Sequence, residues 1–136
     1  MPDPVRIRIE ADTDIVTARQ AGRRLADELG FSPTDATLIA TAISEVARNI
    51  VTYASPGEIE IRAVASHGRR GLEVIARDEG PGIPDVERAL EDGYSTQGGT
   101  GIGLPGARRL MDDFTVDAPP GQGTTVVMRR WHDQRG

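Results

Sequence analysis

The residues of this sequence whose types and spacing could support chemistry lie in three short segments. The first is Glu45–Asn49, within a helical pattern, and the second is Asp78–Gly82, at the end of an apolar strand pattern. The third is the glycine-rich run Gly98–Gly103, just before another helical pattern. In order, they supply a carboxylate with an amide oxygen, a second carboxylate among glycines, and a row of backbone N–H groups. Such groups together could bind a purine, a metal ion and phosphates.

Glu45 and Asn49 are four residues apart on the predicted helix and therefore share one face, which borders the apolar stripe of the same helix. A glutamate there could accept a proton or orient a hydroxyl group. An asparagine oxygen is a hard ligand suited to Mg²⁺, which keeps several waters and takes few protein oxygens. A solvated helix face with an ordinary Glu45–Arg48 pair would show the same pattern, so this segment is not decisive alone.

Asp78 ends a strand pattern and is followed by Gly80 and Gly82. Glycines allow a sharp turn and let a flat ring approach the backbone. The carboxylate could accept a hydrogen bond from the adenine amino group, and guanine would present a carbonyl there instead. A buried, unpaired acceptor costs about 1–3 kcal/mol, which favours ATP over GTP. A β-turn would use the same residues. Thr124, on a late strand, has a hydroxyl that could also reach the base, although strand threonines are common in any sheet.

The glycine-rich run consists of Gly98, Gly99, Thr100, Gly101, Ile102 and Gly103. Free N–H groups and the helix dipole make an anion site at such a helix start, and Arg108 and Arg109 could approach the same phosphates. A Rossmann site is excluded because no apolar strand precedes the run. A Walker A loop is excluded because the chain has no lysine, all 16 basic residues being arginine. A flexible loop before a helix is the alternative.

The elements that must position these groups follow from hydrophobic periodicity. Alternation predicts strands over residues 5–9, 58–65, 72–77, 114–117 and 124–131, with a turn at 68–71. Helical spacing and cap residues predict helices over 12–29, 32–54, 84–90 and 105–112, with Ser32 or Thr34 starting the second, and residues 91–99 form a loop. This order predicts an α+β fold, a two-layer α/β sandwich with a mixed, mostly antiparallel sheet and helices on one face.

Composition limits the class of protein. The 136 residues fit one domain, 1–136. The net charge of −5 argues against nucleic acid or an anionic membrane as a general partner. The absence of cysteine excludes disulfides and cysteine nucleophiles and fits a reducing compartment. With no signal peptide and no apolar run of spanning length, we expect a cytoplasmic protein.

Together the three segments resemble the N, G1 and G2 boxes of the GHKL ATPases, over nearly the whole chain. This resemblance implies a Bergerat-type ATP-binding fold that uses ATP and Mg²⁺. It also implies that Asn49 holds Mg²⁺, that Asp78 binds adenine, and that the 98–103 backbone binds the phosphates. Glu45 would then be the base for the incoming hydroxyl group. No lysine or arginine is assigned to the transferring phosphoryl group.

Residues 42–50 and 92–114 are most similar to the RsbT-type switch protein kinases. That resemblance implies a bacterial serine/threonine kinase that phosphorylates STAS-domain partners within a stress-signalling, partner-switching module and activates a PP2C-type phosphatase by binding. Two alternatives remain open. One is the related anti-sigma-factor kinase, which also sequesters a sigma factor. The other is a non-catalytic ATP-binding interaction module, although an intact Glu45 counts against it.

Overall fold

The computed structural model describes residues 2–79, 103–119 and 123–132, and its strands form one five-stranded sheet. The strands are β1 (Val5–Ile9), β2 (Gly57–Ser66), β3 (Arg69–Asp78), β4 (Asp113–Asp117) and β5 (Thr124–His132). Their order across the sheet is β1-β2-β3-β5-β4, and all four pairings between them are antiparallel. The sheet was expected to be mixed and mostly antiparallel, and the pairings between these strands include no parallel one.

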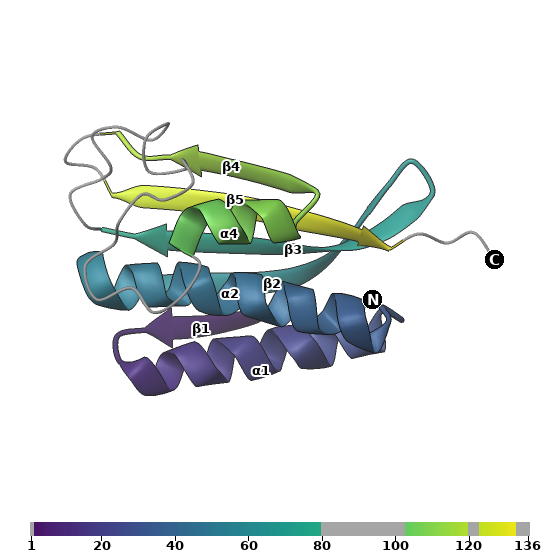
Figure 1. The fold of residues 1–136 in the computed structure, drawn as a ribbon, viewed down its shortest axis with the longest axis horizontal. Helices are drawn as coiled ribbons and strands as arrows, with labels where there is room; N and C mark the ends of the chain where they lie inside the picture. The colour runs from purple at the N-terminus through teal and green to yellow at the C-terminus, as the bar shows by residue number, and fades with distance from the viewer. Residues whose placement is uncertain (1, 80–102, 120–122, 133–136) are drawn as a thin grey trace.

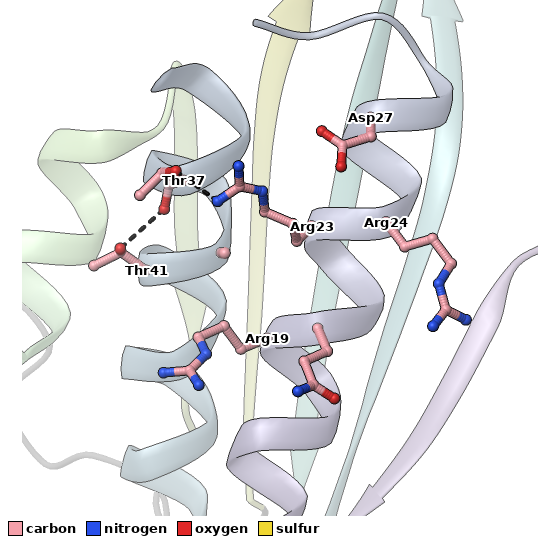
Figure 2. Close-up of a pocket in the computed structure, with 8 residues that line it drawn as sticks. Arg19, Arg23, Arg24, Asp27, Thr37 and Thr41 are labelled. Atoms are coloured by element: carbon pink, nitrogen blue, oxygen red, sulfur yellow. Dashed lines mark hydrogen bonds between the residues drawn. The ribbon is translucent and has the colours of Figure 1, made fainter. Parts of the chain in front are cut away.

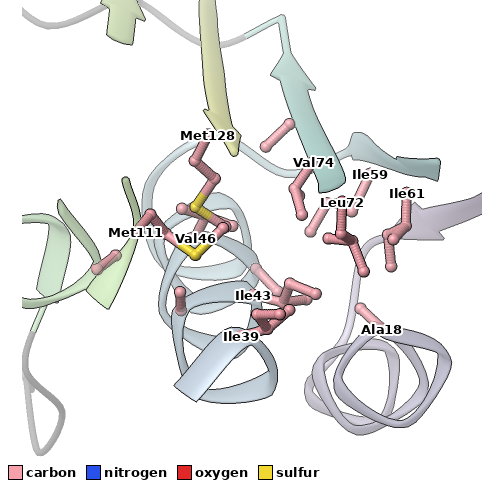
Figure 3. Close-up of a cluster of buried hydrophobic side chains, with 14 of the residues drawn as sticks. Ala18, Ile39, Ile43, Val46, Ile59, Ile61, Leu72, Val74, Met111 and Met128 are labelled. Atoms are coloured by element: carbon pink, nitrogen blue, oxygen red, sulfur yellow. The ribbon is translucent and has the colours of Figure 1, made fainter. Parts of the chain in front are cut away.

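The described helices cover one face of the sheet, which confirms the predicted two-layer α+β architecture (Figure 1). They are α1 (Asp12–Glu28), α2 (Pro33–Tyr53) and α4 (Gly103–Leu110). The apolar side of the sheet meets them because alternate strand residues point to the same face. Figure 3 shows the resulting core, in which α2 contributes Ile39, Ile43 and Val46 and the strands contribute Ile59, Ile61, Leu72, Val74 and Met128.

Cap residues set where α1 and α2 begin and end. The Asp14 carboxylate accepts hydrogen bonds from the backbone N–H groups of Glu10 (2.9 Å) and Ala11 (3.0 Å). These two bonds, chiefly the one from Ala11, lower the pKa of Asp14 because they favour its charged form. The stabilisation of the fold that they provide is therefore present at neutral pH and is lost as the pH falls through the lowered pKa. Gly30 ends α1 at a φ of 87°. Ser32, not Thr34, caps α2 by accepting from Asp35 N–H.

The turn before β3 and the last helix differ most from the sequence prediction. The turn between β2 and β3 is not 68–71, because Ser66 pairs directly with Arg69. Its two central residues are His67 and Gly68, with φ values of 53° and 76°. Two positive φ values fit the right-handed twist of a two-residue hairpin. The last helix begins at Gly103 rather than at residue 105, so Pro105 lies within its first turn, where it removes no helical hydrogen bond.

The helix-free face of the sheet has a ladder of charged pairs. Glu73 is directly opposite Arg62 on β2 and Arg129 on β5. Arg129 Nε donates to Glu73 Oε2 at 2.6 Å, and Arg62 Nε donates to Oε1 at 2.6 Å. The Glu73 side chain is 3% exposed although none of the described helices covers it. The aliphatic stems of the arginines therefore bury this carboxylate while their charged groups stay in water.

No helix among the described residues combines the length and the apolar character that crossing a membrane requires.

Helices α1 and α2 pack closely at Gly22 and Ile43. Ile43 is fully buried, and a Cβ placed on Gly22 of α1 would lie 2.1 Å from its Cδ1 atom. We predict that Ile43→Ala lowers the free energy of unfolding by about 2–5 kcal/mol, because it leaves a cavity between two close helices. Val16, 41% exposed on α1, is the control. Val16→Ala should cost about 0.5 kcal/mol or less in the same urea titration. Equal costs for the two variants would contradict this packing.

Candidate functional site

Glu45 is buried on α2 and paired with Arg48. Its side chain is 7% exposed, and Arg48 Nη1 donates to its Oε2 at 2.5 Å. The Arg48 side chain is 39% exposed. The Glu45–Arg48 pair therefore exists, but its carboxylate lies at the border of the core rather than on a solvated face. Burial and a fixed partner hold the Glu45 carboxylate in one place.

Asn49 lies one helical turn beyond Glu45 and is half-buried. The next residue, Ile50, packs against Gly57 at the start of β2, where an added Cβ would lie 2.7 Å from Ile50 Cγ2. Gly57 is in turn the register partner of Asp78, at the end of β3. The C-terminal part of α2 therefore lies over the paired ends of β2 and β3. This contact brings the helix of Glu45 and Asn49 to the strand end of Asp78.

Asp78 is fixed by the start of β5. Its Oδ1 accepts a hydrogen bond from the backbone N–H of Thr124 at 3.1 Å, and the two residues are register partners. Gly123 has a φ of 82°, and an added Cβ there would lie 2.2 Å from the Asp78 carbonyl oxygen. Because alternate strand residues share a face, Asp78 and Thr124 are on the same side of the sheet as Ala76 and Val126, the side that the helices cover. Thr124 is buried.

The N-terminus of α4 lies at the same end of the molecule. In Figure 1 the end of α2, the end of β3, the start of β5 and the start of α4 all lie toward the left of the view. Gly103 begins α4, and Leu104 is buried in the core. Arg108 and Arg109, predicted to approach phosphates, are exposed on the last turn of this helix.

Several of the predicted nucleotide-binding residues lie outside the described residues. They are Gly80 and Gly82, which follow β3, and Gly98, Gly99, Thr100, Gly101 and Ile102, which precede α4. The predicted helix over 84–90 and the predicted loop over 91–99 also lie outside the described residues. The structure describes the residues on both sides of this segment. The end of β3 and the start of α4, which lie on either side of it in the sequence, are at the same end of the molecule (Figure 1).

Sequence reasoning missed two of the residues that shape this site. Gly57 and Gly123 permit the close contacts with Ile50 and with the Asp78 carbonyl. Each glycine comes directly before or at a strand start in a segment with proline or glycine, which the sequence shows only as a general turn signal. The identity of the atom that each glycine must accommodate depends on tertiary contacts.

A separate hollow of about 560 Å³ opens between α1 and α2 (Figure 2). It is lined chiefly by polar side chains, namely Arg19, Gln20, Arg23, Arg24, Asp27, Thr37 and Thr41. Arg23 Nη1 donates to Thr37 Oγ1 at 2.8 Å across it. None of the predicted site residues lines this hollow, so it is distinct from the candidate nucleotide site.

A family model of the histidine kinase-like ATPase domain matches residues 9–130. The chain belongs to this family. Membership confirms the GHKL resemblance and implies ATP as the nucleotide, whereas Mg²⁺ remains a prediction. The chain is 52% identical over 131 residues to the Serine/threonine-protein kinase RsbT of Bacillus subtilis, covering 96% of this chain and 98% of that protein. The RsbT-type assignment, a serine/threonine kinase, is thereby confirmed.

Further similar proteins and solved structures are more distant in sequence. An Anti-sigma F factor from Caldanaerobacter subterraneus subsp. tengcongensis is 36% identical over 99 residues, covering 68% of each chain. A solved structure of the RsbU and RsbW domains of Rv1364c from Mycobacterium tuberculosis superposes with a TM-score of 0.65 at 22% identity, covering 98% of this chain and 34% of that one. The catalytic domain of the histidine kinase ThkA superposes with a TM-score of 0.54 at 15% identity, covering 93% and 95%. These two structures support the fold.

We predict that Asp78→Asn weakens ATP binding at least tenfold, because the amide would replace an acceptor of the adenine amino group by a group that also donates. Isothermal titration calorimetry with ATP measures the effect. The matched control is Asp117→Asn, which changes an exposed aspartate at the end of neighbouring β4. If the Asp78→Asn variant binds ATP as tightly as the unchanged protein, this carboxylate does not take part in adenine binding.

Proposed function

We propose that this protein transfers the γ-phosphoryl group of ATP to a serine or threonine of a STAS-domain partner, and that residues 1–136 act as one kinase domain in the cytoplasm. In the same proposal, the kinase released from that partner activates a PP2C-type phosphatase by binding to it. The observation that carries this proposal is the buried Glu45 carboxylate on the helix whose end packs over the Asp78 strand. The 52% identity to a serine/threonine kinase over nearly both full chains supports it.

Asp78 is the proposed reader of the purine. Its Oδ1 is already oriented by the Thr124 N–H group at 3.1 Å, so the carboxylate cannot rotate freely when a base arrives. A fixed acceptor selects a ring that presents an amino group and disfavours one that presents a carbonyl, because two facing acceptors would be desolvated without a donor. Thr124, buried beside it, would complete the base pocket through its hydroxyl group.

Asn49 suits the metal that accompanies ATP. Its amide oxygen is a neutral, hard donor, and its half-buried position leaves room for the waters that Mg²⁺ retains. Mg²⁺ bound with ATP would supply charge neutralisation on the phosphates. The backbone of residues 98–103 would hold the phosphates from the side of α4, through N–H groups and the helix N-terminus.

Glu45 is the proposed general base. Its carboxylate would accept the proton of the serine or threonine hydroxyl group as that oxygen attacks the γ-phosphorus in line with the leaving ADP oxygen. No enzyme nucleophile is needed for this direct transfer. The 7% exposure of Glu45 limits competition from water, so an acceptor hydroxyl must be delivered to it by a docked partner. This requirement would couple catalysis to recognition of the partner.

A second candidate function is an anti-sigma-factor kinase, which also sequesters a sigma factor. The relative named Anti-sigma F factor, 36% identical over two thirds of the chain, favours it. Such a protein would form a stable complex with a sigma factor in the presence of ADP or ATP. A non-catalytic ATP-binding module is the third possibility, and it would not require a buried carboxylate at position 45.

The kinase proposal predicts that Glu45→Gln slows phosphoryl transfer about 10²–10⁴-fold while ATP still binds, because the amide cannot accept the proton. The protein is mixed with Mg-ATP and candidate STAS-domain or sigma proteins, and phosphate on the partner is followed by mass spectrometry. Glu58→Gln, a half-buried glutamate on β2, is the control. Transfer at the unchanged rate in Glu45→Gln would exclude this residue as the base, and a stable sigma complex without a STAS substrate would favour the second candidate.

The metal assignment predicts that Asn49→Ala raises the Mg²⁺ concentration needed for half-maximal transfer at least tenfold, because one protein oxygen is lost from the metal. Transfer is measured across a Mg²⁺ titration at saturating ATP. Thr52→Ala, at an exposed position on the same helix, serves as the control. Superimposable Mg²⁺ curves for the Asn49→Ala and unchanged proteins would remove Asn49 from the metal site.

A further inference from the structure

Arg48 is a hydrogen-bonded partner of the proposed base, and one member of this ion pair is buried. Its Nη1 donates a charge-assisted hydrogen bond to Glu45 Oε2 at 2.5 Å. The Glu45 side chain is 7% exposed, whereas that of Arg48 is 39% exposed. The guanidinium therefore reaches from the surface to a carboxylate that water barely reaches.

The helix places Arg48 and Asn49 on opposite flanks of Glu45. At about 100° per residue, Arg48 is rotated about 60° to one side of Glu45 and Asn49 about 40° to the other. All three side chains thus fall within an arc of about 100° on α2. One flank would supply the metal ligand and the other supplies a fixed cation, with the carboxylate between them.

Because Glu45 is buried, its ion pair with Arg48 should matter more than an exposed pair with the same i,i+3 spacing. Ion pairs at i,i+3 on an exposed helix contribute little, because water screens both charges and both side chains lose rotamer freedom. When one partner is buried, removal of the other takes away a charge-assisted hydrogen bond that water does not readily replace, and the carboxylate can then take up another orientation. A new orientation displaces the atom that would accept a proton from the substrate.

We propose that Arg48 is a positioning residue for Glu45, and that phosphoryl transfer depends on it although it contacts neither the nucleotide nor the acceptor hydroxyl. This inference rests on the proposed kinase function. Arginine suits the role because its planar guanidinium holds the carboxylate in a directional, charge-assisted bond, which a lysine ammonium fixes less well. The residue acts only through Glu45, and this separates it from a cation that would neutralise the transferring phosphoryl group.

The test compares Arg48→Gln and Arg48→Lys with the unchanged protein, at saturating Mg-ATP and STAS-domain substrate. We expect Arg48→Gln to lower kcat about a hundredfold, since a displacement of about 1 Å in a reacting group costs that much. The KM for ATP should change less than twofold. Arg48→Lys should recover part of the lost kcat because it restores the charge without the planar geometry.

The matched control is Arg129→Gln. Arg129 also binds a buried glutamate, with Nε 2.6 Å from Glu73 Oε2 and a side chain that is 38% exposed. It lies on the helix-free face, where Glu73 keeps Arg62 as a second partner. We expect Arg129→Gln to leave kcat unchanged. A kcat that falls equally in both variants, in step with the melting temperature, would show a purely structural role and overturn the proposal.

A double variant separates positioning from direct charge stabilisation. If Arg48 acts through Glu45, then Glu45→Gln combined with Arg48→Gln should be no slower than Glu45→Gln alone, because the two changes remove one function. A double variant that is a further tenfold or more slower would assign Arg48 to the phosphoryl group and overturn the proposal.

Failure of the kinase function itself has a different signature. If the unchanged protein transfers no phosphate to any partner, the proposed function fails, and the place of Glu45 is then read from crystal structures of the Arg48→Gln and unchanged proteins. A Glu45 carboxylate that moves by about 1 Å or more in the variant supports Arg48 as its positioning residue. A carboxylate that stays in place overturns it.

Discussion

The packing of one stripe of α2 against the sheet is the constraint on which the site depends. Ile39, Ile43, Val46 and Ile50 are each no more than 2% exposed. Burying such side chains contributes about 1.5–3 kcal/mol each, so rotating the helix by one residue would expose the stripe at a prohibitive cost. That fixed rotation puts Glu45 at the border of the core. It also places Asn49 next to Ile50, which contacts the strand pair that ends at Asp78.

The two key carboxylates are held by different kinds of donor, and this difference matches their proposed tasks. Asp78 accepts a bond from a backbone N–H group, which belongs to the rigid sheet. Glu45 accepts from the guanidinium of Arg48, a charged side chain on its own helix. A reader of adenine needs a fixed position in the sheet. A base needs its accepting oxygen aimed at the substrate hydroxyl group, and the directional bond from Arg48 would provide that aim.

Most of the helices and strands could be predicted because the spacing of apolar residues within each segment indicates its secondary structure. The strand over 5–9, the start of the second helix at Ser32 or Thr34, and the end of the first near residue 29 each follow from a few neighbouring residues. The turn at His67 and Gly68 was misplaced because the glycines at both ends of 68–71 looked equally suited to it. Gly71 instead stays in β3, where the Trp131 ring packs against it and leaves no space for a Cβ. The burial of Glu45 depends on contacts between distant segments. Helical spacing therefore predicted which face of the helix carries Glu45 but not how little of its side chain is exposed.

The central claim is that α2, the end of β3 and the start of β5 contribute to one nucleotide site. Backbone amide NMR during a titration with Mg-ADP tests this claim most directly. We expect the amides of Asn49, Asp78 and Thr124 to shift together and to yield a single Kd. The amides of Arg62 and Arg129, on the helix-free face, should stay in place. Shifts at Asp78 and Thr124 while Asn49 keeps its nucleotide-free position at saturation would contradict a shared site, as would two distinct Kd values.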